Sequence, residues 1–142
     1  MNSKNIKTIT VETIVRADID SVWDCWTKPE HIINWNFASD EWCCPKAEND
    51  LKTNGEFSWR MEAKDGSMGF DFSGTYETII DKELITYKME DGRFVKIAFS
   101  ENQNQTTISE TFDAEGTHAD EQQRAGWQAI LENFKNYVET KK

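Results

Sequence analysis

The last twenty-six residues of the chain, from Thr117 to Lys142, have the pattern of one long amphipathic helix. At ~1.5 Å per residue this helix would run roughly 35 Å, which is longer than a typical strand. Glu132, Lys135, Asn136 and Glu139 would face water. The opposite face carries an apolar stripe, which must pack against another part of the chain. The stripe consists of Trp127, Ile130, Leu131, Phe134 and Val138.

Both ends of this predicted helix carry suitable capping residues. Thr117 can cap the first turn together with Asp120, because the two have the spacing of a capping box. Asp120 and Glu121 suit the positive end of the helix dipole, and Lys141 and Lys142 suit its negative end. We therefore expect the helix to span the whole segment.

The chain between Leu51 and Phe112 predicts short antiparallel strands. Apolar and polar residues alternate through it, as they do from Glu56 to Ala63. Asp65-Gly66 and Asp91-Gly92 are turn signals that join successive strands into hairpins. Gly74 falls on the apolar face, where a glycine often marks a bend, a bulge or the close approach of another group.

The N-terminal part predicts one strand and two short helices. Alternation predicts the strand from about Ile6 to Val15. Asp18 can cap a helix of about two turns, and Pro29 can begin a second helix that reaches Trp35. The segment from Asn36 to Lys46 fits an edge strand or a loop equally well.

This order predicts an α+β fold in which a curved antiparallel sheet of about six to seven strands holds the long C-terminal helix across it. The length fits a single domain over residues 1–142, with residues 1–5 expected to be disordered.

Composition excludes several classes of function. The net charge of -10 would repel phosphate backbones, so we expect no nucleic-acid partner. No apolar run is long enough for a membrane span, and the first residues lack the apolar core of a signal peptide. Cys25, Cys43 and Cys44 are best explained as reduced thiols, so a cytoplasmic location is expected.

The predicted order and several local motifs resemble the START-like superfamily of helix-grip domains, which includes the polyketide cyclases. The resemblance covers roughly residues 9–138 and is strongest to bacterial proteins similar to the C-terminal domain of the heat-shock-protein-90 ATPase activator. It implies an apolar cavity between the long helix and a cupped sheet. The motifs are Val22-Trp23-Asp24-Cys25-Trp26-Thr27-Lys28-Pro29-Glu30-His31, Lys64-Asp65-Gly66-Ser67, Gly69-Phe70-Asp71-Phe72-Ser73-Gly74-Thr75-Tyr76, Asp91-Gly92-Arg93 and Gln123-Arg124-Ala125-Gly126-Trp127.

The eukaryotic co-chaperone of this name has an additional N-terminal domain that contacts the chaperone. The present sequence starts directly with the first strand of the helix-grip unit. We therefore rank chaperone activation below ligand binding.

Glu110 is the most informative polar candidate. The alternation of Ile108, Glu110 and Phe112 places a carboxylate on the face that otherwise enters the core, where it is costly unless paired or close to water. It could orient a ligand or act as an acid of raised pKa. The alternatives are a carboxylate that reaches solvent or one paired with Arg60, Arg93 or Arg124.

Large apolar residues on the long helix and the sheet are candidate walls of a ligand cavity. For any one of them, ordinary core packing is the competing interpretation. With Glu110, the candidate ligand-binding residues are Trp35, Trp59, Phe72, Tyr87, Trp127, Leu131 and Phe134.

No motif predicts catalysis, a cofactor or a metal site. His31 and His118 are the only histidines, and neither has a local partner motif with Cys43 or Cys44.

The leading hypothesis is a non-enzymatic protein that binds a small apolar or amphipathic molecule, with Glu110 or Tyr87 orienting it. A protein-interaction module that acts on a chaperone or other protein is the second hypothesis. A hydrolase or cyclase acting in the cavity is the third.

Overall fold

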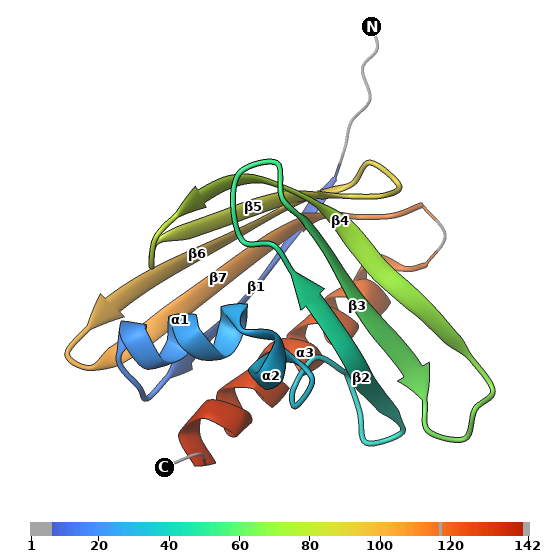
Figure 1. The fold of residues 1–142 in the computed structure, drawn as a ribbon, viewed down its shortest axis with the longest axis horizontal. Helices are drawn as coiled ribbons and strands as arrows, with labels where there is room; N and C mark the ends of the chain where they lie inside the picture. The colour runs from blue at the N-terminus through green and yellow to red at the C-terminus, as the bar shows by residue number, and fades with distance from the viewer. Residues whose placement is uncertain (1–6, 117, 141–142) are drawn as a thin grey trace, which may run out of the picture.

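The computed structural model describes residues 7–116 and 118–140, which form one curled antiparallel sheet with three helices (Figure 1). The predicted strand, two helices, strands and long helix are confirmed in that order. In chain order the elements are β1 (Thr8–Val15), α1 (Ile19–Thr27), α2 (Pro29–Ile32), β2 (Trp42–Asn49), β3 (Glu56–Ala63), β4 (Gly69–Ile80), β5 (Leu84–Met89), β6 (Phe94–Asn102), β7 (Gln105–Asp113) and α3 (Asp120–Thr140).

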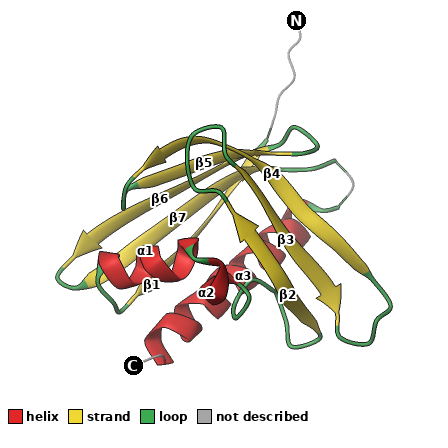
Figure 2. Ribbon diagram, in the orientation of Figure 1, coloured by secondary structure: helices red, strands yellow, loops and turns green. Residues whose placement is uncertain are grey.

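The sheet has the strand order β1-β7-β6-β5-β4-β3-β2, so β1 and β2 are its two edges. Strands β2 to β7 form a meander of hairpins, and β1 pairs antiparallel with β7. The helices lie on the concave side of the sheet (Figure 2). α3 lies closest to β1, at one edge, which leaves space between the helix and the middle strands.

The short elements follow their sequence signals with two refinements. Asp18 caps α1, because its Oδ1 accepts from the backbone N–H of Ser21 at 3.1 Å. α2 ends at Ile32 instead of Trp35, and the chain continues in turns that carry the Trp35 indole N–H to the Cys25 carbonyl, 2.9 Å away. The segment that fitted either a strand or a loop contains the start of edge strand β2, preceded by a loop.

Three sequence predictions lie outside the described residues. They are the disorder of residues 1–5, the capping role of Thr117 and the placement of Lys141 and Lys142 at the end of α3.

The polar face of α3 covers the free edge of β1. Lys135 and Glu139, which were predicted to face water, contact this edge. Three α3 side chains donate to backbone carbonyls of alternate β1 residues, and Glu139 accepts from the backbone N–H of Arg16 at 2.8 Å. The three donor and acceptor pairs are Arg124 with Thr10 at 2.8 Å, Gln128 with Glu12 at 2.9 Å and Lys135 with Ile14 at 2.8 Å. This contact fixes the long helix along the sheet edge.

Gly74 of β4 marks a close approach, as the sequence predicted. A Cβ built there would lie 2.3 Å from the Lys88 carbonyl oxygen and 2.9 Å from the Phe57 ring. We expect Gly74→Ala to lower the free energy of unfolding by about 1–3 kcal/mol, because the backbone of β5 cannot yield without strain.

Gly126→Ala in α3 is the matched control. Nothing lies within 4 Å of a Cβ added at Gly126, and alanine favours helix more than glycine does. This variant should raise the free energy of unfolding by up to about 1 kcal/mol. Urea denaturation of both variants measures the contrast, and a neutral effect at Gly74 would contradict the assigned contact.

Candidate functional site

A cavity of about 500 Å³ lies between the concave face of the sheet and α3. Aromatic rings from α1, the loop after α2, three strands and α3 supply much of its wall. They are Trp26, Trp35, Trp59, Phe70, Phe72, Tyr87 and Trp127.

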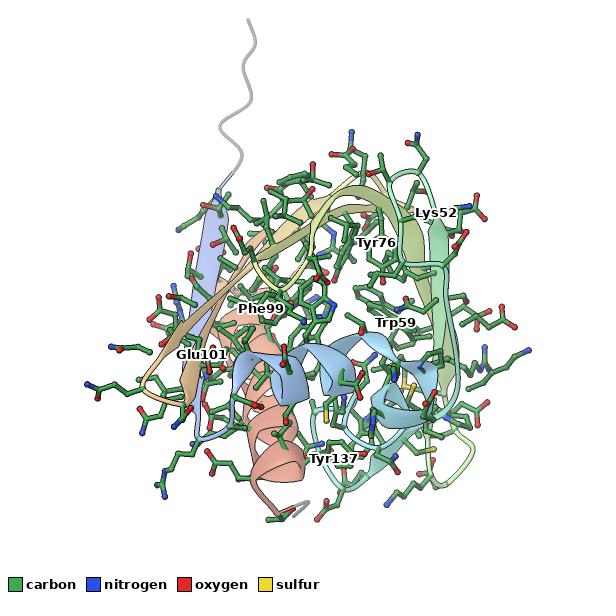
Figure 3. The ribbon with its side chains drawn as sticks, turned by 60° about the vertical axis from the view of Figure 1, so that its left-hand side comes forward. Lys52, Trp59, Tyr76, Phe99, Glu101 and Tyr137 are labelled. Atoms are coloured by element: carbon green, nitrogen blue, oxygen red, sulfur yellow. The ribbon has the colours of Figure 1, made fainter. Side chains whose placement is uncertain are left out.

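Strand alternation explains why these side chains enter the cavity. Trp59 on β3 lies opposite Phe72 on β4, and Ile97 on β6 lies opposite Glu110 on β7. Residues directly opposite in an antiparallel pair share one face of the sheet. Trp59 points into the hollow of the sheet in Figure 3. The pattern that predicts the strands therefore also selects the residues of the cavity wall.

Trp127 links the helix to two distant strands. Its indole stacks on Phe112 of β7 with ring centres 3.9 Å apart and an angle of 11° between the rings. It also meets Phe72 of β4 at 6.2 Å and 68°, and Phe72 in turn stacks with Trp59 at 5.5 Å and 13°. A continuous aromatic wall therefore runs from α3 to β3.

Six of the eight sequence-predicted site residues line this cavity. They are Trp35, Trp59, Phe72, Tyr87, Glu110 and Trp127.

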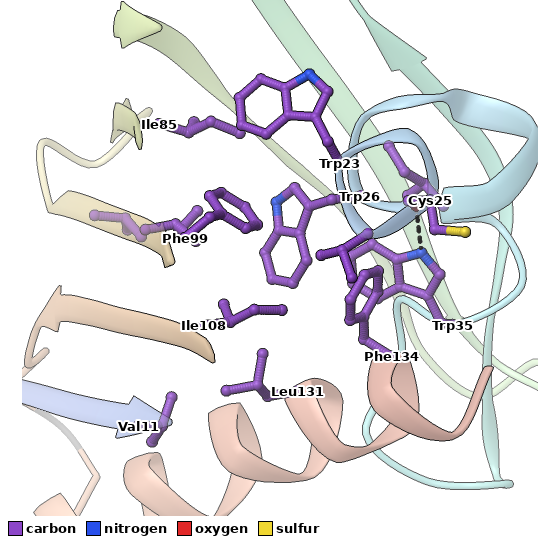
Figure 4. Packing of buried hydrophobic residues seen from close by; sticks show 14 of the residues in the cluster. Val11, Trp23, Cys25, Trp26, Trp35, Ile85, Phe99, Ile108, Leu131 and Phe134 are labelled. Atoms are coloured by element: carbon purple, nitrogen blue, oxygen red, sulfur yellow. Dashed lines mark hydrogen bonds between the residues drawn. The ribbon is translucent and has the colours of Figure 1, made fainter. Parts of the chain in front are cut away.

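Leu131 and Phe134, the other two predicted residues, lie in the core instead (Figure 4). Both are buried, and Phe134 packs edge-on against Trp26 and Trp35 at 4.8 Å each. The physical reason is the position of α1, which packs against α3 and fills the space below its C-terminal half. Only the N-terminal half of the apolar stripe of α3 faces the cavity.

Glu110 is a buried carboxyl to which no described residue is paired. Its side chain lies between Val11 of β1 and Ile97 of β6, its cross-strand neighbours, and is 7% exposed. None of the described residues forms a hydrogen bond or an ion pair with the Glu110 carboxyl. Burial raises the pKa of this carboxyl from an ordinary 4.5 to about 8, so it is mostly protonated at neutral pH.

The three arginines proposed as partners of Glu110 have other contacts. Arg60 pairs with Glu62 and Asp71, and Arg93 pairs with Asp91 at 2.9 Å. Arg124 donates to the β1 edge described above. The alternative of an internal ion pair for Glu110 is therefore wrong, and its carboxyl is available to a molecule in the cavity.

Two further polar groups of the cavity wall also lack partners within the described part of the chain. The indole N–H of Trp59 is buried and donates to no acceptor. The Tyr87 hydroxyl forms no hydrogen bond there either. Burial, then the nearby Glu110 and Tyr76, raise the pKa of Tyr87, and Arg93 acts in the opposite direction. A bound molecule could satisfy these groups.

Sequence reasoning missed Asn36, a buried residue of the cavity lining. Asn133 of α3 donates its amide to the carbonyls of Trp35 and Phe37, at 3.1 Å each, which holds the loop and places Asn36 at the cavity. No hydrogen bond of the Asn36 side chain is formed with the described residues. The sequence carried no signal for it, because the loop has neither strand nor helix periodicity. Gln123 of α3 was missed for another reason: it lies one helical turn before Trp127, but a polar side chain does not add to an apolar stripe.

The two histidines and the adjacent cysteines Cys43 and Cys44 lie away from the cavity lining. His31 is 2.6 Å from the Tyr137 hydroxyl, and His118 is 3.0 Å from the Glu115 carboxylate. Burial raises the pKa of the Cys44 thiol to about 11, which keeps it protonated at neutral pH. Cys44 is thus a poor nucleophile.

Residues 7–116 and 118–140 lack two features. They hold no group of three or more His, Cys, Asp or Glu side chains placed to bind a metal ion. They also include no helix of the length and apolar character needed to cross a membrane.

Comparisons with known proteins agree on one family. A family model described as "Activator of Hsp90 ATPase homolog 1-like protein" matches residues 16–139. The solution structure of the AHSA1-like protein from Aeromonas hydrophila is 42% identical, with a TM-score of 0.90 over 95% of this chain and 94% of that chain. A structure from Cytophaga hutchinsonii is 49% identical, with a TM-score of 0.82 over 94% and 93% of the two chains.

More distant structures share the fold. A protein from Chromobacterium violaceum is 20% identical, with a TM-score of 0.83 over 94% of this chain and 98% of that chain. A comparison with curated proteins gave no match.

Proposed function

The chain belongs to the family of activator of Hsp90 ATPase homolog 1-like proteins, and from this premise we propose that it binds a small apolar or amphipathic molecule in the cavity between α3 and the sheet. The observation that carries the proposal is a cavity with aromatic walls and with polar groups at Glu110, Tyr87 and Trp59 that have no partner among residues 7–116 and 118–140. Ligand sites combine these two features, because apolar walls supply affinity and a few polar groups fix orientation.

The size of the cavity supports this proposal. Its volume of about 500 Å³ falls within the range of roughly 300–1,000 Å³ that small-molecule sites occupy. Under the proposal, Trp35, Trp59, Phe72 and Trp127 contact the apolar part of the ligand. Leu131 and Phe134 support the wall from the core without touching the ligand.

Trp127→Ala should weaken the binding of a neutral apolar dye such as Nile red by about tenfold or more. The indole supplies the wall between α3 and Phe72, and losing a well-packed aromatic contact costs about 1 kcal/mol beyond its buried area. Fluorescence titration of the dye against folded protein measures the effect, with circular dichroism verifying the fold.

Trp42→Ala is the matched control. Trp42 is a half-buried tryptophan of edge strand β2 outside the cavity lining, where it meets Phe70 at 6.1 Å. The control should retain the affinity of the unaltered protein. Equal affinities of the two variants would refute the assigned cavity.

A protein-interaction module remains the second candidate, and the exposed apolar side chains at the start of β4 favour it. Met68 is 63% exposed and Phe70 is 47% exposed. Neighbouring exposed apolar residues are typical of contact surfaces. If this candidate holds, the protein stimulates the ATPase rate of a purified bacterial Hsp90 and Met68→Ser reduces that stimulation. An unchanged ATPase rate counts against it.

A further inference from the structure

The charged residues of the cavity lining are mainly acidic. Arg93 is the single basic residue that the described part of the chain contributes to the lining, and it is already paired with Asp91. Three of the acids are exposed and Glu115 is part-buried, whereas Glu110 is buried. The acidic residues of the lining are Asp71, Glu90, Asp91, Glu110 and Glu115.

The burial of Glu110 points to a ligand independently of the acidic lining. This residue is more than nine-tenths buried, it lines the cavity, and no described residue is paired with its carboxyl. A carboxylate in such a place is costly unless a positive group or hydrogen-bond donors reach it. A cation inside the cavity would supply that partner.

Aromatic rings that line the same cavity are also suited to a positive group. The rings of Trp59 and Phe72 are nearly parallel, and the Tyr87 ring is nearly perpendicular to both, at 87° and 85°. Trp127 closes a further side at 68° to Phe72. The faces of aromatic rings attract cations, so rings exposed to the cavity can contact an ammonium group.

We propose that the ligand is an organic cation, with an apolar body and an amine or quaternary ammonium group that lies beside Glu110 and Tyr87. The inference rests on the proposed function, because it names the class of ligand for the same cavity. An anionic ligand would have to approach five acidic residues and displace Asp91 from Arg93. A neutral apolar ligand would leave the Glu110 carboxyl without a partner.

Three probes with the same ring system test the charge preference. They are (2-naphthylmethyl)trimethylammonium, its neutral carbon isostere 2-neopentylnaphthalene and the anion 2-naphthylacetate. We expect the cation to displace Nile red from the full chain at a concentration about tenfold or more below that of the neutral isostere, with the anion weakest.

Glu110→Gln should lower the affinity for the cation by about tenfold and change the affinity for the neutral isostere by no more than about twofold. Glu101→Gln is the matched control, because it removes one exposed carboxylate near the end of β6, outside the cavity lining. This control should leave all three affinities unchanged, which separates the local effect of Glu110 from the net charge.

The outcomes distinguish this inference from the proposed function. If Nile red binds but the cation shows no advantage, or keeps its advantage in Glu110→Gln, the inference is overturned and the cavity remains a binding site. If neither Nile red nor any of the three probes binds, both fail.

Discussion

Glu110→Gln should stabilise the protein strongly at pH 8 and have little effect at pH 4.5. The pKa of the Glu110 carboxyl is about 8 in the folded protein and near the ordinary 4.5 in the unfolded chain. Below the lower value both states are protonated. Between the two values the unfolded state loses the proton while the folded state keeps it, so the free energy of unfolding falls as the pH rises.

The fall can reach ~1.4 kcal/mol per pH unit, or roughly 3–5 kcal/mol over the whole interval. Glutamine resembles the protonated acid and cannot ionise, so the free energy of unfolding of the variant does not fall over this pH interval. Urea denaturation at a series of pH values measures the difference between the two proteins. Glu101→Gln, at an exposed position near the end of β6, serves as the control and should follow the unaltered protein. Parallel profiles for Glu110→Gln and the unaltered protein would show that burial does not hold the proton on Glu110.

A side chain that lowers stability at neutral pH, and that no residue in the described part of the chain pairs with, is unusual for a residue with only a structural role. Natural proteins tolerate such costs mainly where a residue serves function. The stability of Glu110→Gln therefore bears on function. A variant that is more stable and no longer prefers a cation would show that Glu110 lowers stability and supports ligand binding.

Phe134→Ala should lower the free energy of unfolding by about 3–5 kcal/mol, the second large effect. The Phe134 ring is fully buried and meets Trp26 and Trp35 edge-on, so its removal leaves a void that three elements would have to fill. Thermal and urea denaturation measure the loss.

Phe70→Ala provides the comparison, because Phe70 is 47% exposed and its removal should cost less than about 1 kcal/mol. Phe134→Ala should also keep its affinity for Nile red while it remains folded, since Phe134 does not line the cavity. A small loss of stability combined with a large loss of dye affinity would indicate that Phe134 contacts the ligand, as the sequence predicted.

The two halves of the α3 stripe show what periodicity can and cannot predict. Helical spacing identified the face that carries Trp127, Leu131 and Phe134, and the structure places that face toward the sheet and α1. Periodicity does not reveal where another element packs along the helix. α1 covers the second half of α3, so Leu131 and Phe134 are core residues while Trp127 reaches the cavity.

The strands were more predictable than the loop. Alternation fixes the face of each strand residue, so it placed Trp59, Phe72, Tyr87 and Glu110 on the concave side before their partners were known. Asn36 depends instead on a tertiary contact, the hydrogen bonds from Asn133 across a long sequence separation. Local sequence carries no information about such a contact.

The hydrogen bonds between α3 and β1 bear on how this protein behaves at high concentration. Unpaired strand edges act as templates on which further chains add, and this is how many sheet proteins form fibres. Here α3 occupies the carbonyls of one border, and at the other border Pro45 and an irregular register between Cys43 and Lys46 interrupt β2. Concentrated solutions should therefore resist fibre growth by sheet extension, and truncating α3 should remove that resistance.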